Sequence, residues 1–281
     1  MVCNGIGHVT MQVSNLSTPN YLHRTLRLVS KAWRLIGTAL SFASFGIGGI
    51  VLWLLVFPCL CLLVGDPVRR KTWARNIIRY SFRGFIGLMS SLGVLRYRLD
   101  GLHRLKRGGL LILANHPSLI DTVFLMAFVE NADCIVKAGL WGNPFTRGPV
   151  NAAAYIKNES GPELMDACIA TLVAGNNLII FPEGTRTPEN GQIELKRGAA
   201  NVAVRGVRDI TPVVIHCEPQ TLGKGVPWWQ IPDRQVEFTI SVKNDISVAQ
   251  FIQDGSSEGI AARQLTEFLQ QYFTREKGHH A

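Results

Sequence analysis

The order of hydrophobic and polar residues divides the chain into a helical N-terminal third and a remainder in which strands and helices alternate. Residues 1–20 are polar and show no period, so we expect a mobile tail there. From Tyr21 to Arg34 apolar residues recur at helical spacing, with basic residues between them. This pattern favours a basic amphipathic helix on a bilayer surface over a solvated helix of a folded domain.

The next thirty residues, Leu35 to Val64, carry no charge. This length can span a bilayer once with tilt, or form a helical hairpin that enters and leaves the same leaflet. We expect such a hairpin to break near Gly46–Gly49 or at Pro58. Basic residues flank both ends, and the larger excess on the C-terminal side predicts that the following domain faces the cytoplasm. The sequence leaves the single span and the hairpin both open.

A second helix is predicted from Thr72 to Leu92. Its Arg75, Arg79 and Arg83 follow one another at intervals of four, which places them in a stripe on one face. The stripe could lie against lipid headgroups or face an acidic donor, and a solvated helix face is an equal alternative. We therefore treat residues 21–93 as a membrane-associated helical region.

Strands and helices alternate through residues 94–281. The predicted strands lie near 94–100, 110–114, 132–137, 152–157, 177–181, 210–216 and 235–242, and the predicted helices near 117–130, 162–174, 197–205 and 257–274. Strands separated by helices predict an α/β layered domain with a mostly parallel or mixed sheet flanked by helices.

The candidate chemistry begins after the apolar run at 110–114. Pro117 favours the first turn of a helix, which places His116 at the mouth of a strand-to-helix turn and Asp121 about one turn into the helix. At this separation the carboxylate can hold one imidazole nitrogen and leave the other to act as a base. A histidine held in this way can deprotonate a hydroxyl group at neutral pH.

A second block, Phe-Pro-Glu-Gly-Thr-Arg at 181–186, follows another apolar run. Together the two blocks resemble the glycerolipid acyltransferase family, which makes phosphatidic acid from lysophosphatidic acid. The family pattern Asn-His-x4-Asp matches Asn115, His116 and Asp121, and its second block matches residues 181–186 letter for letter. The resemblance covers roughly residues 94–220. It implies that His116 is the general base and that Asp121 orients it.

The resemblance also implies which residues bind the substrate. Glu183, Gly184 and Arg186 match the block associated with the phosphate of the acceptor, and Lys196 lies in a stretch similar to the family's Lys-x-Gly-Ala. The chain departs from the family at the strand between the two blocks, where Lys157 stands in place of an arginine. A lysine neutralises a phosphate without gripping it as a fork.

Arg147, in a Pro/Gly loop ten residues before Lys157, is a candidate substitute for the missing arginine. The departure leaves a neutral or zwitterionic lipid acceptor open.

Composition narrows the class of partner. A net charge of +9 with 47% hydrophobic and only 17% charged residues indicates a membrane surface. No nucleic-acid-binding pattern accompanies the basic excess. The six cysteines form no Cys-x-x-Cys pair, which is typical of reduced thiols in a cytosol-facing protein, and no signal-peptide pattern follows Met1. The dispersed histidines predict no metal site, and we expect no cofactor.

We therefore expect a membrane-bound O-acyltransferase of the inner, cytoplasmic membrane that functions in phospholipid biosynthesis. Its donor is acyl-CoA or acyl carrier protein, and its acceptor is most simply 1-acylglycerol-3-phosphate. With no Gly-x-Ser-x-Gly elbow or Cys–His pair in the sequence, direct transfer is expected. The alternatives are the same chemistry on a non-glycerophosphate lipid or glycolipid, a catalytically silent lipid-binding protein, and hydrolysis with water as acceptor.

Overall fold

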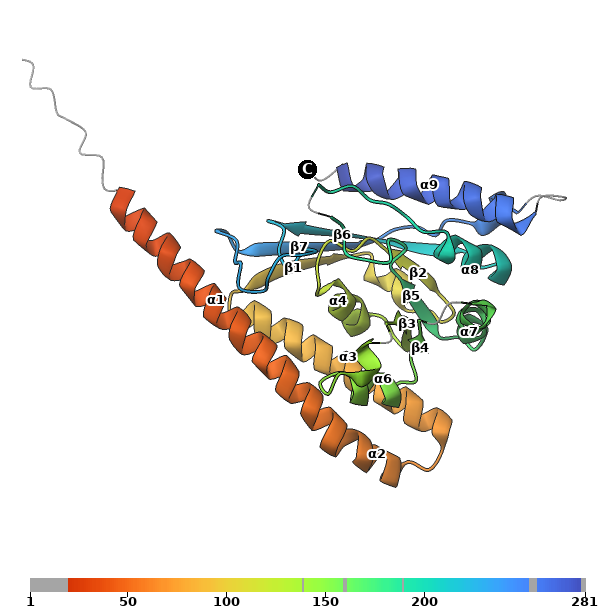
Figure 1. Ribbon diagram of the computed structural model, residues 1–281, viewed down its shortest axis with the longest axis horizontal. Coiled ribbons are helices and arrows are strands. Elements are labelled where there is room, and N and C mark those ends of the chain that lie inside the picture. The colour runs from red at the N-terminus through yellow and green to blue at the C-terminus, as the bar shows by residue number, and fades with distance from the viewer. Residues whose placement is uncertain (1–19, 138, 159–160, 189, 253–256, 279–281) are drawn as a thin grey trace, which may run out of the picture.

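The structure is a computed structural model that describes residues 20–137, 139–158, 161–188, 190–252 and 257–278. Figure 1 shows a long N-terminal helix running past an α/β domain, with the start of that helix standing clear of the sheet. Of the tail expected at residues 1–20, residues 1–19 lie outside the described part of the chain.

The N-terminal region is a helical hairpin. Its elements are α1 (Asn20–Val51), a π-helical turn (Leu52–Val56), α2 (Phe57–Leu63) and α3 (Pro67–Ser91). The first three run on without a gap, and α3 returns beside α1. Within it, His23–Leu63 is long and apolar enough to cross a membrane, which is consistent with membrane association.

The chain reverses at residues 64–66, so the expected break near Gly46–Gly49 or at Pro58 is wrong. Proline lacks an N–H and crowds the carbonyl four residues before it. The π-helical turn directly before Pro58 widens the helix at that point, so the helix continues. At the reversal the Asp66 side chain accepts a hydrogen bond from the N–H of Val68 and begins α3.

The arginine stripe of α3 faces the protein, which contradicts all three predictions for it. Arg75 is buried and pairs with the buried Asp133. Arg79 pairs with Glu130 at 2.9 Å, and Nε of Arg83 donates to the carbonyl of Ala127 at 2.8 Å. The stripe therefore fastens the hairpin to the domain, and the sequence could not reveal it because the partners lie about fifty residues away in the chain.

The domain contains a seven-stranded mixed sheet in the order β1-β7-β6-β2-β5-β3-β4. The strands are β1 (Leu95–Asp100), β2 (Leu111–Ala114), β3 (Ala132–Val136), β4 (Ile156–Lys157), β5 (Asn177–Ile180), β6 (Ile210–Glu218) and β7 (Val236–Val242). All neighbours are parallel except β6 and β7. The predicted fold class, an α/β layered domain with a mixed sheet, is confirmed.

Helices cover both faces of the sheet. They are α4 (Asp121–Phe128), α5 (Gly139–Gly142), α6 (Arg147–Ala152), α7 (Pro162–Val173), α8 (Gly198–Gly206) and α9 (Glu258–Gly278). Helices α3 and α4 pack on one face, and α7, α8 and α9 on the other (Figure 1). Because both faces of the sheet are covered, successive side chains of strand β2 are buried on opposite faces. Ile112 and Ala114 pack in the core on the side of α3 and α4, and Leu111 and Leu113 pack in the core on the other side.

The strand predicted at 152–157 is mostly wrong. Residues 147–152 form the short helix α6, and only Ile156 and Lys157 pair with the sheet. Gly148 of α6 packs so closely on Trp53 of the π-helical turn that no Cβ would fit. This tertiary contact, which no local pattern encodes, holds the segment against the hairpin.

Candidate active site

The candidate site lies where three neighbouring parallel strands end. The segments that follow β2, β5 and β6 are residues 115–120, 181–187 and 219–223, and they meet at the carboxyl edge of the sheet. Asn115 joins the first of these segments to strand β6, because its amide nitrogen donates to the carbonyl of Ile215 and its amide oxygen accepts from the N–H of Ile215, both at 2.8 Å. Asn115 therefore shapes the turn that presents His116.

His116 and Asp121 are in direct contact. Nδ1 of His116 lies 3.0 Å from Oδ2 of Asp121, and the same oxygen accepts a hydrogen bond from the N–H of Ser118 at 2.6 Å. Asp121 is the first residue of α4, so the helix predicted from Pro117 is too long at this end. The carboxylate reaches the imidazole because residues 115–120 form a loop rather than a helical turn.

Burial governs the charge of this pair. Asp121 is fully buried, and burial raises the pKa of its carboxyl group to about 6, although its hydrogen bonds with His116 and Ser118 act in the opposite direction. The His116 ring stacks on Phe181 of the second block with a centroid separation of 4.2 Å. Since Asp121 occupies Nδ1, Nε2 is the ring nitrogen available to a reacting group.

Glu183 connects the two sequence blocks. Its Oε1 accepts hydrogen bonds from the N–H of His116 at 2.8 Å and from the hydroxyl of Thr187 at 2.9 Å. The carbonyl of His116 in turn accepts from the N–H of Thr187 at 2.8 Å. Burial raises the pKa of Glu183 above its ordinary value. Thr187, which the sequence analysis missed, lies one residue beyond the matched block and completes this bridge.

Gly184 and Lys196 also come together. Gly184 has a φ of +67°, and the Lys196 side chain passes so close that a Cβ at position 184 would lie 3.1–3.2 Å from it. The N–H of Lys196 donates to the carbonyl of Pro182 at 2.8 Å. The glycine therefore permits a turn over which the lysine side chain lies.

Arg186 binds the loop that follows β6. One of its terminal nitrogens, Nη1, donates to the carbonyls of Leu222 and Gly223, both at 2.8 Å. The carbonyl of Leu222 also accepts from the N–H of Leu119 at 3.1 Å. Sequence analysis assigned no role to residues 219–223, because their signal is the geometry of the arginine rather than a motif.

The two residues proposed to replace the missing family arginine lie apart from this network. Lys157 ends the edge strand β4 and is exposed. The Arg147 guanidinium lies over the ring of Trp53, 4.7 Å from its centroid, on the helical hairpin.

An apolar cavity of about 480 Å³ lies between the hairpin and the domain. Its walls include Phe45, Phe82 and Phe85 from the hairpin and Thr122 and Val123, which directly follow Asp121. A volume of this size lies in the range of roughly 300–1,000 Å³ that is typical of small-molecule sites.

Residues 96–216, which contain both sequence blocks of the site, match the protein family described as Acyltransferase. Over this part the chain is similar to the acyltransferase family. The match spans β1 to β6 and includes both blocks.

Two relatives of this acyltransferase domain carry the name 1-acyl-sn-glycerol-3-phosphate acyltransferase. The protein from Pseudomonas aeruginosa is 29% identical over 151 residues, covering 50% of this chain and 56% of that protein. The protein from Helicobacter pylori is 31% identical over 161 residues, covering 55% of this chain and 65% of that protein. The chain thus matches less than two thirds of the length of these relatives.

A solved structure has the same fold. The crystal structure of the 1-acyl-sn-glycerophosphate (LPA) acyltransferase PlsC from Thermotoga maritima aligns with a TM-score of 0.64 at 18% identity. The alignment covers 89% of this chain and 98% of that one, so the likeness extends beyond the family match into the helical region.

Proposed function

We propose that the protein transfers a fatty acyl group from an acyl thioester to a hydroxyl group of a lysophospholipid. The acceptor is 1-acylglycerol-3-phosphate and the product is phosphatidic acid. The observation that carries the proposal is the contact between His116 and Asp121 at the edge of the sheet. The names of the relatives support the reaction class and the acceptor.

In the proposed reaction Nε2 of His116 takes the proton of the acceptor hydroxyl as its oxygen attacks the thioester carbonyl. The new C–O ester bond forms, the C–S bond breaks, and the leaving thiolate receives the proton from the imidazolium. Asp121 holds the tautomer that leaves Nε2 unprotonated and stabilises the positive charge that develops on the ring.

Direct transfer agrees with the state of the thiol near the site. Burial, with smaller contributions from Asp121 and Glu218, raises the pKa of Cys217 to about 12, so this thiol is protonated at neutral pH and a poor nucleophile. An acylated protein isolated after incubation with the donor alone would contradict direct transfer.

The apolar cavity supplies a place for an acyl chain. It begins beside Thr122 and Val123, immediately after Asp121, and extends between α1 and α3 of the hairpin. The membrane-associated region at 21–93 and the domain at 94–281 would thus form the cavity together. We place the protein in the inner, cytoplasmic membrane with its domain in the cytoplasm, as the basic flanks of the apolar helix indicate.

The arrangement of the cations gives a second candidate for the acceptor. Arg186 uses Nη1 on two backbone carbonyls, and Arg147 lies on Trp53. Lys196, which lies over Gly184, would then bind a phosphate as a point charge rather than as a planar fork. A non-glycerophosphate lipid or glycolipid acceptor is the alternative that this arrangement favours.

The test is acyl transfer by detergent-purified protein. Lysophosphatidic acid and a panel of non-phosphate lyso-lipids would be offered with labelled acyl-CoA and, in parallel, labelled acyl carrier protein. We expect transfer to lysophosphatidic acid that His116→Ala abolishes and that His103→Ala, a variant of an exposed histidine, leaves unchanged. Transfer confined to other acceptors would establish the second candidate.

The same variants separate the enzyme from a silent lipid-binding protein. Lipid binding that survives in His116→Ala while transfer is lost supports the enzyme. No transfer by the unaltered protein to any acceptor, with lipid binding intact, would identify a lipid-binding protein of the same fold. Thioester cleavage without an acceptor would instead identify a hydrolase.

A further inference from the structure

The connection between β6 and β7, residues 219–235, carries an exposed pair of aromatic side chains. Trp228 is 41% and Trp229 is 60% exposed, and their rings meet edge to face with centroids 5.8 Å apart. Two adjacent exposed tryptophans are costly in water and suit the boundary between headgroups and acyl chains, where the indole ring is apolar and its N–H finds a partner.

This pair lies beside the membrane-associated helix. The Trp228 ring lies 6.2 Å, centroid to centroid, from the ring of Phe42 on α1, inside the uncharged stretch of that helix. The exposed apolar side chains Ile36, Leu40 and Ile47 lie on the same uncharged stretch of α1, on the face turned away from Phe42. The tryptophan pair is therefore in contact with the stretch of α1 that is apolar enough for lipid.

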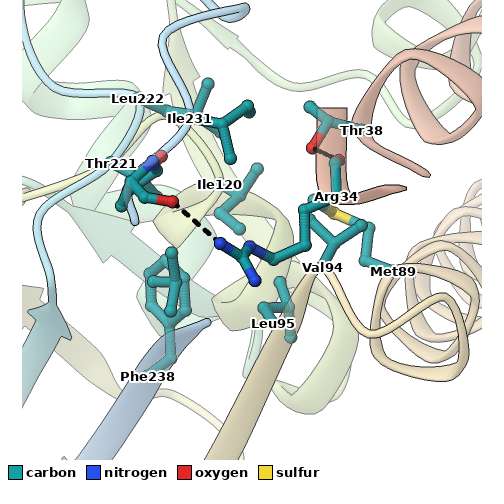
Figure 2. Close-up of a pocket in the computed structure, with 12 residues that line it drawn as sticks. Arg34, Thr38, Met89, Val94, Leu95, Ile120, Thr221, Leu222, Ile231 and Phe238 are labelled. Carbon is teal, nitrogen blue, oxygen red and sulfur yellow. Dashed lines mark hydrogen bonds between the residues drawn. The ribbon is translucent and has the colours of Figure 1, made fainter. Parts of the chain in front are cut away.

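Polar contacts fix the connection to α1 at the start of the uncharged stretch. Nη2 of Arg34 donates to the carbonyls of Pro232 and Asp233 at 3.1 and 2.9 Å, and Nζ of Lys31 pairs with Asp233 at 2.6 Å. Figure 2 shows the Arg34 side chain extending from α1 into a pocket whose walls include Ile120 and Leu222.

Arg34 is the last charge before the apolar stretch, and Phe42 follows it by eight residues. At 1.5 Å per residue this is about 12 Å along the helix axis. A tilted α1 whose uncharged stretch begins at the level of the headgroups thus brings the tryptophan pair to the depth of the interface.

We propose that residues 224–231, through Trp228 and Trp229, are a second membrane-binding element that inserts at the lipid–water interface beside α1. The occupant of this surface is the bilayer itself. The exposed Lys224 on the same segment adds a charge that favours anionic headgroups. Insertion would fix the rotation of the domain about α1, which a single helix cannot do.

The element also borders the candidate site. The carbonyls of Leu222 and Gly223, directly before this segment, hold Arg186, and the carbonyl of Leu222 holds the N–H of Leu119. Lipid contact at the tryptophan pair would therefore set how the mouth of the site faces the headgroups. This consequence rests on the proposed function, whereas the membrane contact itself does not.

The contact is tested first without catalysis. Full-length protein and Trp228→Phe/Trp229→Phe are placed in vesicles of phosphatidylcholine and phosphatidylglycerol that carry brominated lipids. The difference in fluorescence between the two proteins reports Trp228 and Trp229. We expect bromine near the glycerol to quench this component more strongly than bromine near the chain end. If a water-soluble quencher reaches this tryptophan fluorescence equally well with and without vesicles, the proposal is overturned.

The rate of acyl transfer gives the second readout. Phe268→Ala is the matched control, because Phe268 is an exposed aromatic residue on α9, across the sheet from α1. Trp228→Ala/Trp229→Ala should lower transfer to an acceptor embedded in vesicles about tenfold, the size that lost orientation can produce. It should preserve transfer to a short-chain acceptor in detergent, and Phe268→Ala should preserve both. Equal losses on both acceptors would mean that the pair serves folding, and would overturn the proposal.

Two further outcomes are distinguishable. A loss seen with acyl carrier protein but not with acyl-CoA, with lipid quenching unchanged, would assign the pair to a protein partner and overturn the membrane assignment. Lipid quenching of the pair in a protein that transfers no acyl group would refute the proposed function while supporting the membrane contact.

Discussion

At the scale of single residues, the site buries two carboxyl groups next to one histidine. Asp121 is fully buried beside His116, and Glu183 is buried beneath the backbone of His116. Both carboxyl groups therefore have a raised pKa, because burial disfavours their charged forms. Activity and stability consequently respond to pH in opposite directions here.

The protonation of Asp121 predicts the pH dependence of transfer. The proposed mechanism requires an ionised Asp121, so the rate should fall as the pH drops through about 6. The pH profile of kcat/KM measures this, and Asp121→Asn should have a low rate without that acid limb. An unchanged acid limb in Asp121→Asn would assign it to another group.

The stability of the fold should follow the opposite course. The folded-state pKa of Asp121 lies above the unfolded value, so between about pH 4 and 6 the folded state binds more protons than the unfolded state. The free energy of unfolding from this group should therefore be highest below pH 4 and fall by about 3 kcal/mol as the pH rises through 6. Chemical denaturation of the wild type and of Asp121→Asn across this pH range measures how the free energy of unfolding of each depends on pH. If the carboxyl group is solvated, the two proteins show the same pH dependence.

Glu183 should matter for stability as well as activity. Glu183→Ala leaves the N–H of His116 and the hydroxyl of Thr187 buried without their acceptor, a change that costs about 1–3 kcal/mol of unfolding free energy. Glu183→Gln keeps one acceptor oxygen and should lose less. Glu194→Ala, at an exposed position, serves as the control in the same chemical denaturation experiment.

At the scale of elements, the arginines of α3 differ in what they contribute. Nη2 of Arg75 binds Asp133, whose Oδ2 also accepts the hydroxyl of Thr171, and all three side chains are buried. Arg79 instead pairs with a Glu130 carboxylate that is 58% exposed. One helix thus carries a buried and an exposed ion pair one turn apart.

This difference predicts unequal costs for two similar variants. Arg75→Met leaves a buried carboxylate without its cation and should lower the free energy of unfolding by about 3–5 kcal/mol. Arg79→Ala should change it by about 0–1 kcal/mol, because solvent replaces the partner. Chemical denaturation in detergent compares them, and equal effects would show that the Asp133 site is not dry.

The packing of α1 on the segment before α6 offers another matched pair. A Cβ at Gly49 would collide with the carbonyl oxygen of Phe145, whereas a Cβ at Gly48 would meet nothing within 4 Å. Gly49→Ala should therefore lower the melting temperature by forcing the backbones apart, and Gly48→Ala should leave it unchanged or raise it. A fall in both would indicate a general need for helix flexibility.

At the scale of the whole molecule, the helical hairpin places Cys59 and Cys61 near its tip, and both are exposed. If the hairpin enters one leaflet and returns, these thiols lie in lipid. In a Cys3→Ser background they should then resist maleimide added to either side of sealed vesicles, because a thiol in lipid stays protonated, and should react once detergent dissolves the membrane. Reaction from the side opposite the domain would establish a single span.

Residues close together in the chain were predicted well, and contacts between distant segments were not. The strands near 110–114 and 177–181 and the order of elements follow from local hydrophobic period. The burial of Arg75, the helix at 147–152 and the role of Thr187 depend on Asp133, Trp53 and Glu183, which lie elsewhere in the sequence. The motifs located the site, but only the fold revealed that Arg186 binds a backbone loop.

The position of β1 has a consequence for synthesis. Leu95–Asp100 is an edge strand whose neighbour in the sheet is Val236–Val242, and the register joins Leu95 to Val236, about 140 residues later. During translation the hairpin and β1 therefore emerge long before the strand that completes their end of the sheet. Loop closure over this distance makes the pairing of β1 a late event. The nascent chain must hold an unpaired strand next to the membrane until Val236–Val242 has left the ribosome.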